Sequence, residues 1–296
     1  MNNNVAIQCM GLTKDYGSRQ GLFDLNLEIK YGEVFGLIGP NGAGKSTFIK
    51  LLMDLIIPTK GLARILGLDS REDSLELKKI IGYLPGELMQ FPSVTAGYLL
   101  NLLLNMRGIE DREYLHTLAN RLQLDLSRKF QDLSHGNKQK VALIQAFMHK
   151  PKLLILDEPT LGLDPIIQRE LRNMIQEFKV GGNTVILSSH VLSEVESICT
   201  RIALIHEGSV IKEGSLEDLR SERIHKISAI FANEIPAKPE LEAAGASSIE
   251  FENRTVRFDM KGSISKALEV LAKHEVLELD SRELSLEEVF FSEVQS

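Results

Sequence analysis

The sequence has no long apolar segment and few cysteines. No run of about 18 uncharged apolar residues occurs in its 296 residues, so a membrane-spanning helix is not expected. The first ten residues, MNNNVAIQCM, have neither the basic nor the apolar region of a signal peptide. Cys9 and Cys199 stand far apart without a CxxC or Cys/His cluster, which gives no support to a disulfide framework or a zinc site. We therefore expect a cytoplasmic chain with two reduced, buried thiols.

Positive charge is in the minority, since 34 Lys and Arg stand against 41 Asp and Glu, for a net charge of −7. A protein that holds nucleic acid through phosphate contacts usually has a basic patch or stripe, so no nucleic-acid partner is expected. Residues 225–296 hold 8 Lys and Arg against 14 Asp and Glu, which places most of the net charge there. This step in composition indicates a domain boundary near residue 222.

The apolar pattern predicts an α/β core. Residues 5–17 and 22–39 alternate as strands do, and helical spacing follows at 48–56. The all-apolar runs 153–157 and 184–189 have the length and composition of central parallel strands.

Two further segments complete this reading of the core. Residues 98–125 and 137–150 are mostly helical in pattern, and 201–214 predict a hairpin that turns at Glu207 and Gly208. From about Ile224 the pattern changes to short strands and one helix, at 263–274. We interpret this last part as a small α+β unit.

A glycine-rich loop between a strand and a helix matches the pattern G-x-x-x-x-G-K-[ST]. Its glycines let backbone N–H groups turn toward a β-phosphate at a helix N-terminus, where the helix dipole also favours an anion. The lysine is expected to reach the β and γ oxygens, and the serine hydroxyl to bind Mg²⁺. The predicted nucleotide-binding residues are Gly39, Pro40, Asn41, Gly42, Ala43, Gly44, Lys45, Ser46 and Thr47.

Two adjacent carboxylates, Asp157 and Glu158, follow the buried run 153–157. Ligands bind at the carboxyl ends of strands in parallel α/β sheets, so both side chains are expected to face the same crevice as the glycine-rich loop. Asp157 fits a Mg²⁺ ligand, acting directly or through water. Glu158 fits the base that polarises the attacking water.

The motifs together resemble those of ATP-binding-cassette (ABC) ATPase subunits. DLSHGNKQK at 132–140, LDEPTLGLDP at 156–165 and LSSH at 187–190 follow the glycine-rich loop in the family's order and spacing. The resemblance covers about residues 5–220. It implies a P-loop NTPase core with an antiparallel β subdomain and an inserted helical subdomain at about 86–150, which gives an ATPase domain at 1–222 and a small acidic domain at 223–296.

The resemblance also implies roles for single residues. Ser134 and Gly136 should contact the γ-phosphate of ATP held by a second copy of the chain, and Asp164 should lie across the same interface. His190 should contact the γ-phosphate and the attacking water, with Lys45 and Glu158 as its catalytic partners. Tyr16 should stack on adenine.

Three positions depart from the family's common pattern. Gly86 stands where the family usually has a glutamine that senses Mg²⁺ and couples to the permease, with Glu87 after it. His135 replaces a glycine of the signature, and Leu161 replaces a small residue. None of them removes the groups most needed for hydrolysis, which are Lys45, Asp157, Glu158 and His190. A third reading, a nucleotide-dependent regulatory domain with little hydrolysis, draws on these departures.

The expected function is that of an ATP-hydrolysing subunit that drives a separate membrane permease. Such a subunit would be peripheral on the inner face of the cell membrane. The LSHGNKQK and LSLEEVFF segments resemble those of subunits that serve ABC-2-type exporters. A soluble clamp on a ribosome or nucleic acid is the alternative. Leu88, Met89 and Phe91 either meet the permease or pack inward. Leu286, Val289 and Phe290 either pack on the core or on a second subunit.

Overall fold

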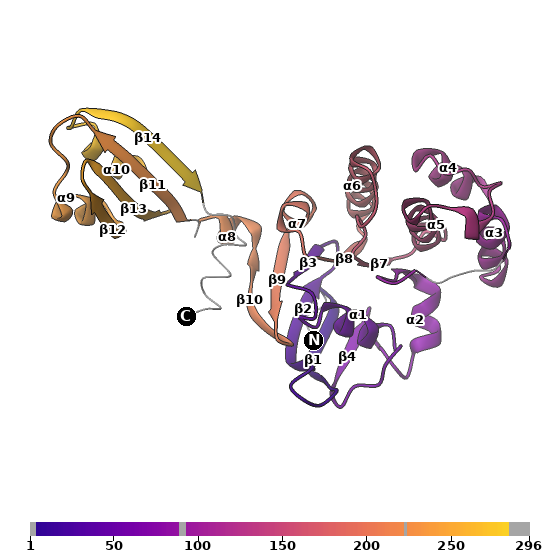
Figure 1. The fold of residues 1–296 in the computed structure, drawn as a ribbon. Coiled ribbons are helices and arrows are strands. Elements are labelled where there is room, and N and C mark those ends of the chain that lie inside the picture. Colours follow the sequence, from indigo (N-terminus) through magenta and orange to yellow (C-terminus); the bar gives the residue numbers. More distant parts are fainter. Residues whose placement is uncertain (1–3, 89–92, 222–223, 284–296) are drawn as a thin grey trace. The chain divides into compact units, whose positions relative to one another are not determined.

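The computed structural model describes residues 4–88, 93–221 and 224–283, and the chain divides into two compact units, Met1–Gly214 and Ser215–Ser296 (Figure 1). The boundary thus falls eight residues before the one expected from composition. Met89, Phe91, Leu286, Val289 and Phe290 lie outside the described residues, so their expected packing stays a prediction. None of the helices in the described ranges has the length and apolar character needed to cross a bilayer.

The first unit contains a central sheet of strand order β10-β9-β3-β8-β7-β6. Its strands are β3 (Val34–Ile38), β6 (Ile81–Leu84), β7 (Leu153–Asp157), β8 (Thr184–Ser189), β9 (Arg201–His206) and β10 (Ser209–Ser215). The strands from β9 to β6 pair in parallel, and β3, β7 and β8 are buried along their whole length. Burial on both faces explains why these strands read as continuous apolar runs.

A second sheet of order β2-β1-β4-β5 is antiparallel. It consists of β1 (Val5–Asp15), β2 (Gly21–Lys30), β4 (Lys60–Ile65) and β5 (Leu68–Asp69). Figure 1 shows this sheet and α1 on one face of the central sheet, with α6 and α7 on the other. One buried apolar cluster joins both sheets through α1, whose Phe48 and Ile49 are fully buried.

The helices of this unit include the inserted group expected from the pattern. They are α1 (Lys45–Leu52), α2 (Ser74–Ile80), α3 (Ala96–Met106), α4 (Glu113–Arg121), η1 (Phe130–Asp132), α5 (His135–Phe147), α6 (Pro165–Val180) and α7 (Leu192–Ile198). Arg121 ties α4 to α6 because its guanidinium contacts Glu170 at 2.5 Å and Glu177 at 2.6 Å. The α/β core with an antiparallel sheet and inserted helices confirms the predicted fold class.

The second unit has the element order β-α-β-β-α-β after α8 (Leu216–Ser221). The elements are β11 (Ile224–Phe231), α9 (Lys238–Ala243), β12 (Ala246–Glu252), β13 (Thr255–Lys261), α10 (Ser265–Leu271) and β14 (Val276–Glu283). The sheet is antiparallel with order β12-β13-β11-β14, which is the split βαβ or ferredoxin-like arrangement. Its own buried cluster, which includes Phe231 and Phe258, gives it a separate core. The sequence reading had one helix here and missed α9 and β14.

Candidate active site

The glycine-rich loop runs from the end of β3 into α1, as expected. Gly44 precedes the first helical residue with φ of 110°, in the region of backbone conformation that favours glycine. A Cβ at this position would lie 3.0 Å from the carbonyl oxygen of Gly21 on β2. The loop therefore needs glycine here, directly before the N-terminus of α1, where a helix favours an anion.

Lys45 is the first residue of α1 and is almost completely buried. Its ammonium group donates to the carbonyl oxygens of Gly39 at 2.5 Å and Pro40 at 3.2 Å. It also lies 3.7 Å from Oε1 of Glu158. Burial lowers the pKa of Lys45, while the carboxylates of Glu158 and Asp157 oppose that shift. The carbonyl groups of the loop thus hold the Lys45 ammonium group in place.

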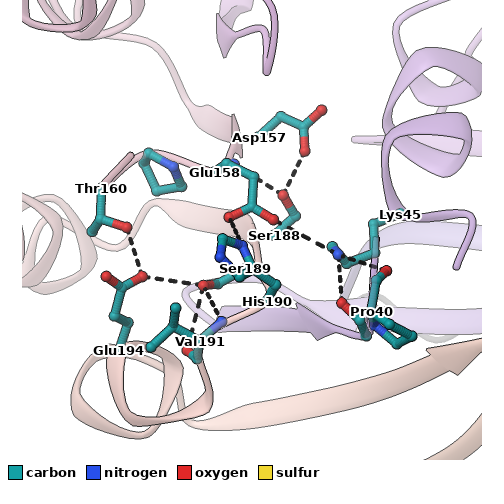
Figure 2. A network of polar contacts seen from close by, with 12 residues as sticks. Pro40, Lys45, Asp157, Glu158, Thr160, Ser188, Ser189, His190, Val191 and Glu194 are labelled. Carbon is teal, nitrogen blue, oxygen red and sulfur yellow. Dashed lines mark hydrogen bonds and ion pairs between the residues drawn. The ribbon is translucent and has the colours of Figure 1, made fainter. Parts of the chain in front are cut away.

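Asp157 and Glu158 stand at the carboxyl end of β7, beside the end of β8 (Figure 2). Ser188 on β8 pairs with Asp157 in the sheet, donates from Oγ to Asp157 Oδ1 at 2.5 Å, and accepts from the Glu158 N–H at 3.0 Å. Glu158 has φ of 50°, in the left-handed region that residues with a side chain seldom adopt. The two adjacent carboxylates have different partners: Asp157 accepts from Ser188, whereas Glu158 contacts Lys45 and His190.

The Glu158 carboxylate bridges two basic side chains. Its Oε2 lies 2.9 Å from Nδ1 of His190, and its Oε1 faces Lys45 (Figure 2). The side chain of Glu158 is 17% exposed and that of His190 is 43% exposed, so solvent reaches the pair. A carboxylate fixed beside an imidazole at an open strand end has the geometry of a base that can orient water.

Further polar groups hold the turn that carries His190. Glu194 on α7 accepts from Thr160 Oγ1 at 2.6 Å and from Ser189 Oγ at 3.1 Å (Figure 2). Sequence reasoning missed Thr160, Ser188, Ser189 and Glu194. Ser188 had a signal, because it occupies the end of the predicted strand 184–189 next to the strand that carries Asp157.

A cavity of about 750 Å³ joins the loop to the carboxylates. Its lining includes residues 41–47 of the glycine-rich loop, Asp157 and Glu158, and also Tyr83 and Gly86. Burial, with a smaller contribution from Asp157, raises the pKa of Tyr83 to about 12, so this hydroxyl stays protonated. The structure thus brings the loop, Asp157 and Glu158 around one hollow, as the sequence predicted.

The remaining predicted residues lie elsewhere on the first unit. Ser134 caps α5 and its Oγ accepts from the N–H of Asn137 at 3.3 Å. Asp164 caps α6, since its Oδ1 accepts from Ile166 and Ile167, each at 3.0 Å. Neither they nor Gly136 are among the described residues that line the cavity. Their predicted contact with a second copy's nucleotide stays a prediction.

Tyr16 lies just after β1 and is 54% exposed. The ammonium of Lys14 stands 5.2 Å from the centre of its ring. The ring is therefore available to a planar ligand on the surface, although Tyr16 is not one of the described cavity-lining residues. Its stacking on adenine is a prediction that this geometry permits.

Each of the three departures has a definite environment. A Cβ on Gly86 would lie 2.8 Å from Oδ2 of Asp157, so the absence of a side chain lets the Gly86 backbone lie against the Asp157 carboxylate. A Cβ on Gly162 would lie 2.6 Å from Cδ2 of His135, which places the imidazole against that glycine. Leu161 is 46% exposed, and nothing in the structure explains the leucine.

Mg²⁺ fits this donor set only together with a nucleotide. No group of three or more His, Cys, Asp or Glu side chains suited to a metal occurs within the described part of the chain. Mg²⁺, however, is commonly held by one or two protein oxygens plus substrate phosphates and water. Ser46 and Asp157 both line the cavity and supply such oxygens.

Comparisons with known proteins agree with this chemistry. A family model described as ABC transporter matches residues 22–161. YcbN of Bacillus subtilis, an uncharacterized ABC transporter ATP-binding protein, is 32% identical, and the match covers 96% of this chain and 95% of YcbN. The bacitracin transport ATP-binding protein BcrA of Enterococcus faecalis is also 32% identical, over 96% of this chain and 94% of BcrA.

Solved structures extend the likeness to three dimensions. The ATP-binding subunit of an ABC transporter superposes with a TM-score of 0.68 at 33% identity, covering 73% of this chain and 92% of that one. A dimeric ATP-binding cassette in a post-hydrolysis state, bound to ADP and Pi, has a TM-score of 0.62 at 27% identity, over 71% and 98% of the two chains. The likeness in sequence thus extends beyond the part covered by these structures.

Proposed function

Because this chain belongs to the ATP-binding, ATP-hydrolysing subunits of ABC transporters, we propose that two copies of it power export through a separate membrane permease. Export is supported by the relative named for bacitracin transport. Pairing is supported by the dimeric cassette bound to ADP and Pi. The cargo is set by the permease.

The observation that carries the hydrolytic assignment is the placement of Glu158 between Lys45 and His190. In the proposed reaction, Lys45 draws the β- and γ-phosphates into the loop, and Glu158 accepts the proton of the water that attacks in line. His190, which contacts Oε2 of Glu158 at 2.9 Å, orients that carboxylate and meets the γ-phosphate. Mg²⁺ held near Ser46 and Asp157 would neutralise phosphate charge.

The proposed dimer completes the site from a second copy. The first turn of α5, with Ser134 and Gly136, presents a helix N-terminus to the partner's γ-phosphate, and Asp164 lies at the same interface. ATP then favours the closed dimer because its γ-phosphate makes contacts that ADP lacks. Each cycle of closure and reopening would move the permease.

The decisive experiment replaces the base and leaves the binding site intact. Glu158→Gln should abolish ATP turnover while ATP binding persists, and the ATP-bound dimer should accumulate in size-exclusion chromatography. Lys45→Ala should lose both binding and turnover. Normal turnover in Glu158→Gln would refute the assignment of Glu158. Absence of activity in the wild type with its permease present would favour the regulatory reading.

An apolar stripe on α3 supports a membrane partner at the helical subdomain. Tyr98, Leu102 and Met106 follow one another at intervals of four residues and are 59%, 42% and 76% exposed. Residues four apart lie on one face of a helix, so the three side chains form one strip of apolar surface. We assign this strip to the permease.

The partner assignment can be tested separately from hydrolysis. Leu102→Glu with Met106→Glu should release the chain from membranes that contain its permease. Basal ATP hydrolysis should stay within about twofold, because both side chains are exposed and neither is among the described residues that line the cavity, and a surface change has a small effect on stability. Val180→Glu is the matched control, since Val180 is exposed at the end of α6. Membrane binding unchanged in the double variant would refute the assignment.

The relatives described above lend no support to the ribosome or nucleic-acid clamp.

A further inference from the structure

Gln139 joins α5 to the peptide that carries the proposed base. It is the fifth residue of α5 and is 3% exposed. Its Nε2 lies 3.2 Å from the carbonyl oxygen of Glu158 and 3.3 Å from that of Pro159. A glutamine amide has two N–H donors, so Gln139 can give one to each of two successive carbonyls.

The backbone of Glu158 needs such support. Its φ of 50° lies in the left-handed region, which a residue with a side chain adopts only where its surroundings hold it. The Glu158 N–H donates to Ser188 Oγ at 3.0 Å, and the carbonyl oxygen accepts from Gln139 and from the N–H of Leu161 at 3.2 Å. Gln139 therefore fixes the carboxyl side of the residue whose side chain faces His190 and Lys45.

A second contact joins the first turn of α5 to the same loop. A Cβ on Gly136 would lie 2.5 Å from the carbonyl oxygen of Gly162, so the helix backbone packs directly on the loop. On the other side of this contact, the ring of His135 lies against Gly162. The beginning of α5 and the loop after β7 are thus connected by backbone packing near Gly162 and by side-chain hydrogen bonds near Glu158.

We propose that Gln139 is a positioning residue, through which the N-terminal turn of α5 sets the orientation of Glu158. This inference rests on the proposed function, in which Ser134 and Gly136 contact ATP held by the second copy. A shift of the first turn of α5 on that ATP reaches the Glu158 and Pro159 peptides through Gln139. The base of one subunit therefore responds to the nucleotide bound by the other.

The test removes the two donors and keeps the volume of the side chain. In Gln139→Met and Gln139→Leu, kcat for ATP hydrolysis should fall about tenfold, because the peptides that hold the base in place for the transition state lose the hydrogen bonds from Gln139. KM for ATP should stay within about twofold, because the glycine-rich loop is untouched. The matched control is Gln176→Ala, since Gln176 on α6 donates to the carbonyl oxygen of Ile198 at 3.3 Å, in a part of the chain the mechanism does not use.

The outcomes separate this inference from the proposed function. Unchanged kcat in both folded Gln139 variants, with turnover abolished in Glu158→Gln, would overturn the inference alone. Equal losses in kcat and in nucleotide affinity would also overturn it, because they indicate a general loss of structure. Unchanged turnover in Glu158→Gln would overturn the proposed base, and the role of Gln139 with it.

A double-mutant cycle tests the link to the partner's nucleotide. If Ser134 and Gln139 act along one path, Ser134→Ala combined with Gln139→Met should lower kcat by less than the product of the two single losses. Losses that multiply would show that the two residues act independently and would overturn the proposed path from α5 to Glu158.

Discussion

Nδ1 of His190 lies 2.9 Å from Oε2 of Glu158, so the imidazole and the proposed base form one unit. His190→Ala should therefore lower kcat for ATP hydrolysis by at least about 100-fold, the range in which positioned acid–base groups contribute. Steady-state hydrolysis measures this. His116→Ala on the exposed surface of α4 is the control and should retain full activity. A loss below threefold in His190→Ala would show that Glu158 needs no imidazole.

Gly86 allows close approach to Asp157, and this can be tested with Mg²⁺. In Gly86→Ala the new Cβ would lie 2.8 Å from Asp157 Oδ2, so the carboxylate must move. We expect the Mg²⁺ concentration for half-maximal hydrolysis to rise about tenfold, as is common when a group beside a metal ligand is disturbed. Binding of ATP measured without Mg²⁺ should be unchanged. An unaltered Mg²⁺ dependence would remove Asp157 from the proposed metal site.

Asp164 has a capping role that can be separated from its proposed interface role. Asp164→Ala loses the two bonds to Ile166 and Ile167 and should lower the free energy of unfolding by about 1 kcal/mol. Asp164→Asn keeps a capping oxygen and should retain most of that stability. Chemical denaturation measures both variants. If ATP-driven dimerisation falls in Asp164→Asn although stability is kept, the residue acts at the interface; if both are kept, it is only a cap.

His149 should make the fold sensitive to acid. Burial, followed by the charge of Arg107, lowers the pKa of His149 to about 4, and its Nε2 lies 3.1 Å from the carbonyl oxygen of Ile81. Because the unfolded imidazole has a pKa near 6.5, the unfolded state binds the extra proton between these values. Stability is therefore complete above about pH 6.5 and is lost as the pH falls toward 4, by about 2 kcal/mol at pH 5.

The check on His149 is the pH dependence of unfolding. His149→Gln cannot take up a proton, so its free energy of unfolding should vary less than that of the wild type between pH 7.5 and pH 5. His116→Gln is a matched control, since His116 is exposed on α4. Equal acid sensitivity in wild type and His149→Gln would show that other groups dominate.

The sequence predicts the residues whose roles depend on local geometry. The glycine-rich loop and Lys45 are contiguous, and their conformation follows from one strand, one turn and one helix. Asp157 and Glu158 follow from the rule for strand ends. Those residues were found from the pattern because a glycine-rich motif and the end of a buried strand can both be located along the sequence itself.

Long-range contacts escaped the sequence reading. The bond from Ser188 to Asp157 joins residues 31 apart and depends on β7 and β8 being neighbours in the sheet. In the sequence, Gln139 is one polar residue among several on a predicted helix. Its role becomes visible only in the structure, where the loop after β7 packs on α5. Alternation and helical period report which face of an element is buried, and they do not report what it meets.

The second unit was read less completely for a different reason. The helix α9 is six residues long with Pro239 in its first turn, which is allowed there but reads as a loop. The strand β14 is an edge strand in the sheet order, and its sequence VLELDSRE is largely polar. Edge strands carry charged side chains that keep other strands from pairing, so β14 lacks the apolar alternation of a typical strand.

The two buried thiols allow local opening of the fold to be measured by alkylation. Cys9 lies on β1 in the antiparallel sheet, and Cys199 follows α7, where its Sγ lies 2.9 Å from where a Cβ on Gly36 of β3 would be. Burial raises the pKa of both thiols, so neither forms a reactive thiolate while it stays buried. In Cys199→Ala, the rate of alkylation of Cys9 then measures how often the region around β1 opens. In Cys9→Ala, the rate of alkylation of Cys199 measures how often the packing of the end of α7 against β3 opens.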